Sequence, residues 1–61
     1  NLEAEIQLGA GGEWRSMEAI SDAIRRYRDP EQGLYQARAR WTGPQNAVGE
    51  WSFPLAEITI A

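Results

Sequence analysis

The fold is decided by the stretch WRSMEAISDAIRRY, which runs from Trp14 to Tyr27. Its apolar residues recur at steps of three and four, at Trp14, Met17, Ile20, Ile24 and Tyr27. This spacing places them along one stripe of an α-helix, with the charged residues on the opposite side. A helix with a single apolar stripe needs a sheet or another helix to cover it. The stretch therefore predicts an amphipathic helix that lies on a sheet and stops at Asp29-Pro30.

The segments on either side of this stretch have the alternation of β-strands. In residues 2–8 and 34–42, apolar or small residues alternate with polar ones, which is typical of half-buried strands. In the second of these, Tyr35, Ala37, Ala39 and Trp41 share one face, and Gln36, Arg38 and Arg40 share the other. We expect Arg38 and Arg40 to face Glu3 and Glu5 as cross-strand charge pairs.

A third strand is predicted over residues 50–60, after a turn-rich hairpin loop at 43–49. Trp51, Phe53 and Leu55 fall on one face of this strand, whereas Ile58 and Ile60 fall on the other. Pro54 lies near this change of parity, so a bulge that exchanges the two faces is expected there. An alternative is that both faces are buried, the second by another subunit.

These elements predict an α+β fold in the order β-α-β-β. One amphipathic helix would pack on a three-stranded, mainly antiparallel sheet, in a single small domain over residues 1–61. A chain of 61 residues is near the lower limit for independent folding, and the absence of cysteine excludes disulfide bonds. We therefore expect self-association to complete the fold, as a homo-oligomer.

Composition excludes several classes of function. Without histidine, cysteine or lysine, the usual metal ligands and most catalytic groups are missing, so we predict no metal site, no cofactor, no catalytic residue and no enzyme activity. The net charge of −3 argues against nucleic acid, and no apolar run is long enough to span a membrane. The start of the chain lacks the pattern of a signal peptide, and the compartment stays open.

Three motifs could carry chemistry. The loop Gly9–Gly12 follows a strand and precedes the predicted helix, as a phosphate-binding loop does, although a plain turn is the simpler interpretation. Glu18 and Asp22 lie four residues apart and could act as an acid–base pair, but a solvated helix face explains them. Arg25, Arg26 and Arg28 could bind an anion, although they also suit the last turn of a helix.

The aromatic residues give the strongest functional signal. Three tryptophans, two tyrosines and one phenylalanine are bulky for one helix over three short strands. We therefore predict that some rings are left for a partner, with the arginines beside them. The candidate binding residues are Tyr35, Trp41, Trp51, Phe53, Arg38 and Arg40. The favoured function is a non-enzymatic, self-associating protein-interaction module.

One family offers an alternative. The predicted β-α-β-β order and the run GGEWRSMEAISDAIRR, residues 11–26, resemble the dodecins, which are small flavin-binding shells. The resemblance implies that a flavin or another planar ligand stacks near the start of the second strand, where Tyr35 stands. A further alternative is a fragment of a larger protein, or a designed chain, without autonomous activity.

Overall fold

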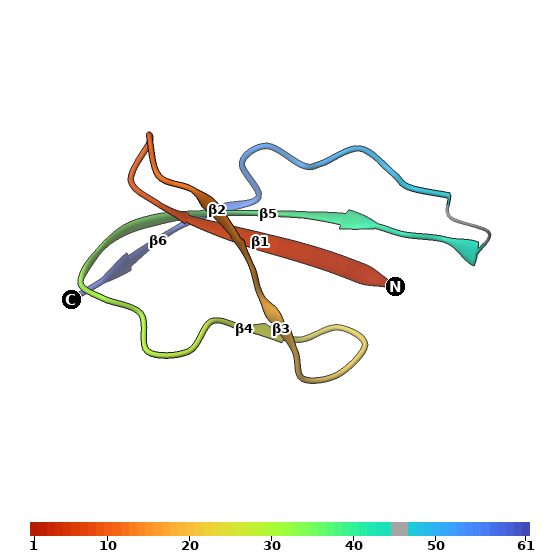
Figure 1. Ribbon diagram of the computed structural model, residues 1–61, viewed down its shortest axis with the longest axis horizontal. Helices are drawn as coiled ribbons and strands as arrows, with labels where there is room; N and C mark the ends of the chain where they lie inside the picture. The colour runs from red at the N-terminus through yellow and green to blue at the C-terminus, as the bar shows by residue number, and fades with distance from the viewer. Residues whose placement is uncertain (45–46) are drawn as a thin grey trace.

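The computed structural model describes residues 1–44 and 47–61 and contains no α-helix among them (Figure 1). These described residues form six β-strands, namely β1 (Leu2–Leu8), β2 (Trp14–Ser16), β3 (Glu18–Ala19), β4 (Arg25–Arg26), β5 (Gly33–Trp41) and β6 (Ala56–Ile60). Four of them form one sheet in the order β2-β1-β5-β6, and β3 and β4 form a separate two-stranded hairpin. The prediction of an α+β fold is therefore wrong, and the chain is nearly all sheet.

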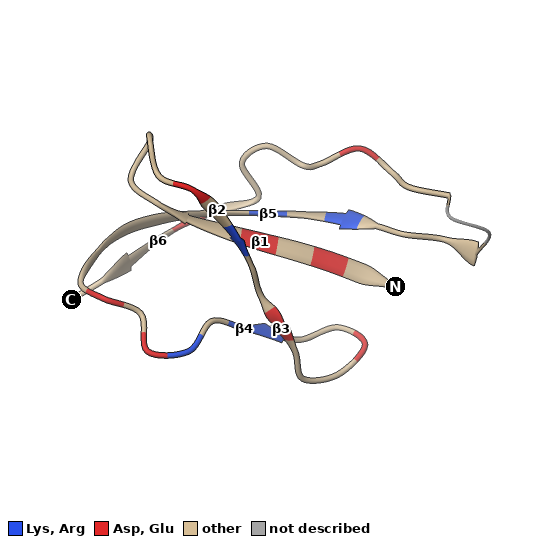
Figure 2. Cartoon of the chain, viewed as in Figure 1, with Lys and Arg blue, Asp and Glu red and all other residues tan. Residues whose placement is uncertain are grey.

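The two long strands, β1 and β5, form the centre of the sheet and confirm the alternation in the sequence. They are antiparallel, in a register that places Leu2 opposite Trp41 and Leu8 opposite Tyr35. The same register sets Glu5 opposite Arg38 and Glu3 opposite Arg40, and both pairs form ion pairs, as predicted. Figure 2 shows the acidic residues of β1 beside the basic residues of β5.

The predicted helix over Trp14–Tyr27 is replaced by β2, β3, β4 and the turn between β3 and β4. An isolated helix of this length is marginally stable in water, and Ser16, Ser21 and Asp22 weaken it further because their side chains compete for backbone groups. A helix would also leave the outer edge of β1 without backbone partners. In the structure, β2 pairs with that edge, and the Met17 amide donates to the Ala4 carbonyl at 3.0 Å.

The apolar residues of this stretch do not share one face. Ile20 and Ile24 are exposed at the β3–β4 hairpin, where the Ile20 amide donates to the Ile24 carbonyl at 2.9 Å. Tyr27 packs its ring against that of Tyr35, with the centroids 6.1 Å apart. Trp14 lies on the other face of the sheet, beside Arg38. Apolar residues that recur at steps of three and four, as in a helix, therefore lie here on strands and a turn and point in different directions.

The loop Gly9–Gly12 is a turn that β2 follows, so it opens no helix. The side chain of Gln7, which is buried, donates to the carbonyls of Gly12 at 2.7 Å and of Ala10 at 3.3 Å. These bonds satisfy the amide group of a buried polar residue and hold the turn against β1. The helix N-terminus that a phosphate-binding loop requires is absent at this position.

The predicted third strand over residues 50–60 is regular only in β6. Residues 49–55 run along the edge of β5 through single hydrogen bonds, from Gly49 to Trp41, from Ser52 to Ala39 and from Leu55 to Ala37. The Phe53–Pro54 peptide bond in this segment is cis. The predicted hairpin loop 43–49 includes residues 45 and 46, which lie outside the described residues.

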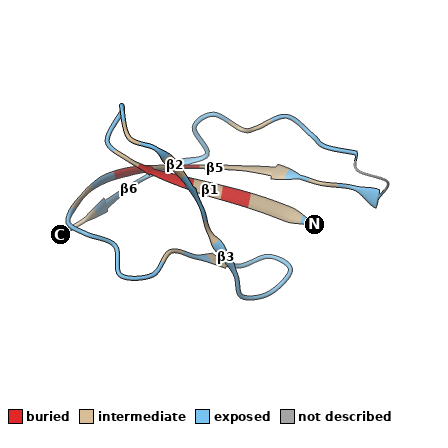
Figure 3. Cartoon of the chain, viewed as in Figure 1, coloured by how far each residue is buried: buried red, intermediate tan, exposed pale blue. Residues whose placement is uncertain are grey.

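The buried core is small and lies on one face of the sheet, which we call the tyrosine face. Its buried members are Ala4, Ile6, Tyr35 and Ala37. Figure 3 shows that burial is confined to the middle of β1 and the first half of β5. The opposite face carries Glu3, Glu5, Arg38 and Arg40, and we call it the arginine face. The hairpin and the Tyr27 segment stand where a covering helix was expected.

Candidate functional site

Aromatic and arginine side chains alternate in a stack on the arginine face. The guanidinium carbon of Arg38 lies 4.1 Å from the ring centroid of Trp14 and 4.5 Å from that of Trp51. The guanidinium of Arg40 lies 4.0 Å from the same Trp51 ring. Contacts of this kind are attractive because the face of an indole ring is electron-rich. The stack therefore joins β2, β5 and the irregular segment before β6.

Carboxylates of β1 neutralise both arginines of this stack. Arg38 donates to Oε1 of Glu5 through Nε at 3.0 Å and Nη2 at 2.6 Å, and both side chains are largely buried. Arg40 donates to Oε1 of Glu3 at 2.8 Å, while its Nε is buried without a hydrogen-bond partner in the described part of the chain. The charges of both arginines are thus neutralised within the sheet. The arginines therefore position Trp51 and do not form an open anion site.

Phe53 extends the stack but remains open to solvent. Its ring packs against Trp14 with the centroids 6.0 Å apart and the planes tilted by 59°. Even so, 69% of Phe53 is exposed. The ring is therefore attached to the stack at one side and available at the other.

Beside this stack lies an apolar groove of about 580 Å³ that we call the Trp41 groove. Its walls include Leu2, Ala39, Trp41, Glu50, Trp51 and Leu55. Trp41, at the end of β5, is 66% exposed, and Leu55 is also exposed. Large apolar side chains that remain exposed together mark binding surfaces more often than isolated ones do.

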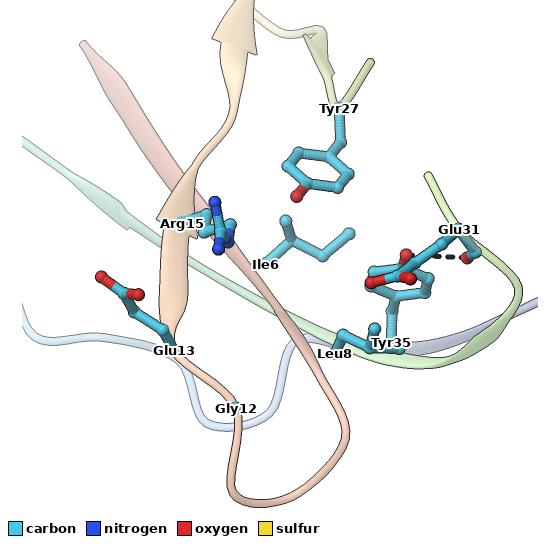
Figure 4. A pocket seen from close by; sticks show the side chains of 8 residues that line it. All are labelled: Ile6, Leu8, Gly12, Glu13, Arg15, Tyr27, Glu31 and Tyr35. Atoms are coloured by element: carbon cyan, nitrogen blue, oxygen red, sulfur yellow. Dashed lines mark hydrogen bonds between the residues drawn. The ribbon is translucent and has the colours of Figure 1, made fainter. Parts of the chain in front are cut away.

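A second cavity, of about 380 Å³, lies on the tyrosine face (Figure 4). Ile6, Leu8, Tyr27 and Tyr35 form its apolar part, and Glu13, Arg15 and Glu31 form its charged rim. The Tyr35 hydroxyl donates to the Glu31 carbonyl at 2.8 Å. Burial of this hydroxyl, together with the nearby charge of Glu31, raises the pKa of Tyr35.

The structure brings five of the six predicted binding residues together. Trp51, Arg38 and Arg40 form the stack and Phe53 extends it, whereas Trp41 belongs to the tyrosine face of β5 and meets the others only as a further lining residue of the groove that Trp51 and Arg40 also line. The sixth, Tyr35, is only 2% exposed and belongs to the core.

Several members of the site were not predicted as binding residues, among them Trp14, Glu50 and Leu55. Trp14 had been assigned to the helix stripe, so nothing in the spacing placed it on the arginine face. Leu55 shares sequence parity with Trp51 and Phe53, and this parity was the available signal for it.

Three arginines outside the stack, Arg25, Arg26 and Arg28, are engaged locally. Arg25 donates to the carbonyls of Leu2, Ser21 and Ile24, and so covers the end of β1 and closes the hairpin turn. Arg26 and Arg28 both bind Glu18, whose pKa they lower, the hydrogen bond from Arg28 most strongly. Arg25, Arg26 and Arg28 thus do not complete the last turn of a helix. Glu18 binds two arginines and does not share a helix face with Asp22.

Groups that could hold a metal ion are not clustered in the described residues, where no three acidic side chains come together. No helix in residues 1–44 and 47–61 has the length and hydropathy needed to cross a membrane. The element order on which the likeness to dodecins rested is also absent, because residues 11–26 form no helix. Comparison of the chain with family models, with curated proteins and with solved structures finds no match.

Proposed function

We propose that the chain is a non-enzymatic module that binds a partner protein through the Trp41 groove. The observation that carries the proposal is Trp41 itself, an indole that is 66% exposed on the wall of an apolar groove. Tryptophan is one of the residue types enriched at the energetic centre of protein interfaces. Its ring supplies a large contact area with few rotatable bonds.

Trp51, which also lines the groove, is already held in place. Trp51 lies between Arg38 and Arg40, and each of these is anchored to a carboxylate of β1. Hydrogen bonds from the Gly49 amide to Trp41 and from the Ser52 amide to Ala39, each 2.9 Å long, attach the backbone of this segment to β5. A wall that is ordered before binding loses little entropy when a partner docks.

The charges of the groove indicate the chemistry of the partner. Glu50 is one of its lining residues, the charges of Arg38 and Arg40 are neutralised within the sheet, and the chain as a whole carries −3. A segment with a large apolar side chain flanked by arginine or lysine complements this surface. The same negative charge disfavours nucleic acid, whose binding depends on neutralising phosphates.

Selection of a displayed random-peptide library on the immobilised chain tests the proposal. We expect the enriched peptides to carry an aromatic or large aliphatic residue with a basic residue beside it. Their affinity should fall roughly tenfold or more in Trp41→Ala, since a buried aromatic anchor is worth 2 kcal/mol or more at such a site. Glu50→Gln should weaken the same peptides less and reduce the dependence of binding on salt.

The matched control is Ile24→Ala, which removes an exposed apolar side chain at the β3–β4 hairpin, outside the groove. Its peptide affinity should equal that of the original chain. Enrichment of peptides without an apolar anchor, or affinities that Trp41→Ala leaves unchanged, would contradict the proposal.

A further inference from the structure

The strand β6 ends the sheet with an open edge. It is the last strand in the order β2-β1-β5-β6, and its five residues are Ala56, Glu57, Ile58, Thr59 and Ile60. The other end of the sheet is the three-residue β2, from which the chain turns away into the hairpin. Short edges resist pairing with other chains, whereas a longer, regular edge with little charge invites it.

Hydrogen bonding on β5 shows which groups of β6 face outward. The Gly9 amide bonds the Leu34 carbonyl, so Leu34 faces β1, whereas Leu55 and Ser52 bond the carbonyls of Ala37 and Ala39. The odd-numbered residues of β5 thus face β6, and Tyr35 is opposite Ile58. Because these groups alternate along an antiparallel ladder, Ile58 bonds inward and Glu57 and Thr59 point their amides and carbonyls outward.

These outward groups have no partner in the part of the chain that the structure describes. No backbone or side-chain hydrogen bond joins the Glu57 or Thr59 main chain to a segment beyond the edge. Ile58, between them, is still 38% exposed on the tyrosine face. The edge therefore offers unpaired donors and acceptors together with an apolar side chain, which is what an added strand requires.

We infer that β6 pairs with β6 of a second copy of this chain, antiparallel and about a two-fold axis at Ile58. This register sets Glu57 opposite Thr59 of the other copy, so that both outward residues gain backbone hydrogen bonds. The two Ile58 side chains meet on the tyrosine face, as a close pair without backbone bonds between them. The result is one continuous sheet in which each copy supplies four strands.

Charge and strand length select this register. An axis at Glu57 would place two carboxylates directly opposite each other, an arrangement that destabilises a strand pair. Ile58 is the middle residue of β6, so an axis there also pairs the whole strand, whereas an axis at Thr59 would shorten the overlap. Two equal surfaces related by a two-fold axis give a closed dimer, and this is the commonest arrangement of oligomers.

The exposed area of the chain is consistent with a missing partner. Its accessible surface is 4578 Å², whereas a compact monomer of 6.8 kDa exposes about 4000 Å². The difference, roughly 600 Å², approaches the ~800 Å² that each partner buries in a standard interface. The radius of gyration, 12.0 Å, likewise exceeds the ~10.5 Å of a compact chain of this length.

Sedimentation equilibrium from about 1 μM to about 1 mM tests the dimer. We expect the mass to approach twice 6.8 kDa, and Thr59→Pro to return it to that of the monomer. Proline removes the outward amide at an edge position where proline is tolerated. Thr59→Val, which keeps the amide, should still dimerise, and Trp41→Ala should do so as well because the Trp41 groove lies elsewhere.

Amide hydrogen exchange on the original chain gives a second readout that needs no variant. The amides of Glu57 and Thr59 should become at least tenfold slower to exchange as concentration rises, whereas the exchange of Ile58 should change less. A monomeric mass at every concentration, or a dimer that a folded Thr59→Pro retains, would overturn the inference. If Thr59→Pro does not fold, exchange of these two amides that is independent of concentration would overturn it equally.

Discussion

Trp51 lies over the guanidinium of Arg38 at 4.5 Å, which fastens an irregular segment to the arginine face of the sheet. The same guanidinium also binds Glu5 and contacts Trp14. One arginine thereby links three separate parts of the chain. Removing its side chain should lower the free energy of unfolding of the whole sheet and not only loosen the local segment.

We expect Arg38→Ala to lower the free energy of unfolding by about 2 kcal/mol, because it removes two stacking contacts and leaves Glu5 without its cation. Arg15→Ala is the matched control, since Arg15 is an exposed arginine of β2. Its effect should stay within about 0.5 kcal/mol. Urea denaturation followed by far-ultraviolet circular dichroism measures both, and equal losses would contradict a structural role for the stack.

Gly12 approaches the end of β1 too closely for any side chain. A Cβ atom at this position would lie 2.1 Å from the carbonyl oxygen of Leu8, and the backbone would have to move. We expect Gly12→Ala to lower the free energy of unfolding by about 1–3 kcal/mol, as other overcrowded sites do. Gly11→Ala places its Cβ in open space and should be nearly neutral. Thermal unfolding of the two variants side by side decides the point.

The stability of the fold should decline in strong alkali because of Tyr35. Burial raises the pKa of this hydroxyl above the ordinary value of 10.0. A group whose pKa is higher in the folded state contributes stability that is complete below pH 10 and is lost as the pH rises through the folded pKa. Tyr35→Phe cannot ionise, so its stability should fall less steeply above pH 10, after a small loss at neutral pH from the missing bond to Glu31. Parallel alkaline profiles of the two chains would contradict this.

Glu18 should make the fold less stable in acid, whereas Tyr35 makes it less stable in alkali. Hydrogen bonds from Arg28 and then Arg26 hold the pKa of Glu18 below its ordinary 4.5. Because the folded pKa is the lower one, the stability it contributes is present above pH 4.5 and is lost as the pH falls through the folded pKa. A carboxyl-carbon NMR titration should give a midpoint below 4.5 that rises more in Arg28→Ala than in Arg26→Ala. The reverse order would show that Arg26 is the stronger partner.

We predict that a flavin does not stack on Tyr35, because the ring is 2% exposed and packs against Tyr27. We expect flavin mononucleotide and adenosine triphosphate to leave the intrinsic tryptophan fluorescence unchanged after correction for ligand absorption. Saturable quenching that Trp41→Ala abolishes would instead identify the Trp41 groove as a site for planar ligands.

The central pair of strands could be predicted from the sequence, and the Trp14–Tyr27 stretch could not. In β1 and β5, strict alternation and opposite charges define both the faces and the register, because a shift of one residue would bury Glu5 and Arg38 on the tyrosine face. In the Trp14–Tyr27 stretch, the apolar spacing suits a helix equally well. The backbone groups at the outer edge of β1 require hydrogen-bond partners, and this requirement favours strands over a helix. The spacing of apolar residues gives no sign of it.

The candidate site was predictable in its residue types and less so in its geometry. Arg38 and Arg40 were placed correctly relative to Glu3 and Glu5. The expectation that Trp51 and Phe53 share a face with Tyr35, and Ile58 with the arginines, is wrong: Ile58 is opposite Tyr35, and Trp51 stacks on Arg38. Tyr35 and Trp41 share a face and a strand, yet one is buried and the other exposed. The difference arises because Tyr27 covers only the first half of β5, and only the path of the chain after β4 reveals this.

The pairing of β1 with β5 also determines how the chain folds. The segments that pair are residues 2–8 and 33–41, so the intervening hairpin region must be looped out before the middle of the sheet can form. Closing such a loop costs entropy before any cross-strand contact repays it, and folds dominated by distant antiparallel pairs reach the native state in milliseconds to seconds. Nucleation of the central pair should therefore depend on the meeting of the first and third quarters of the chain.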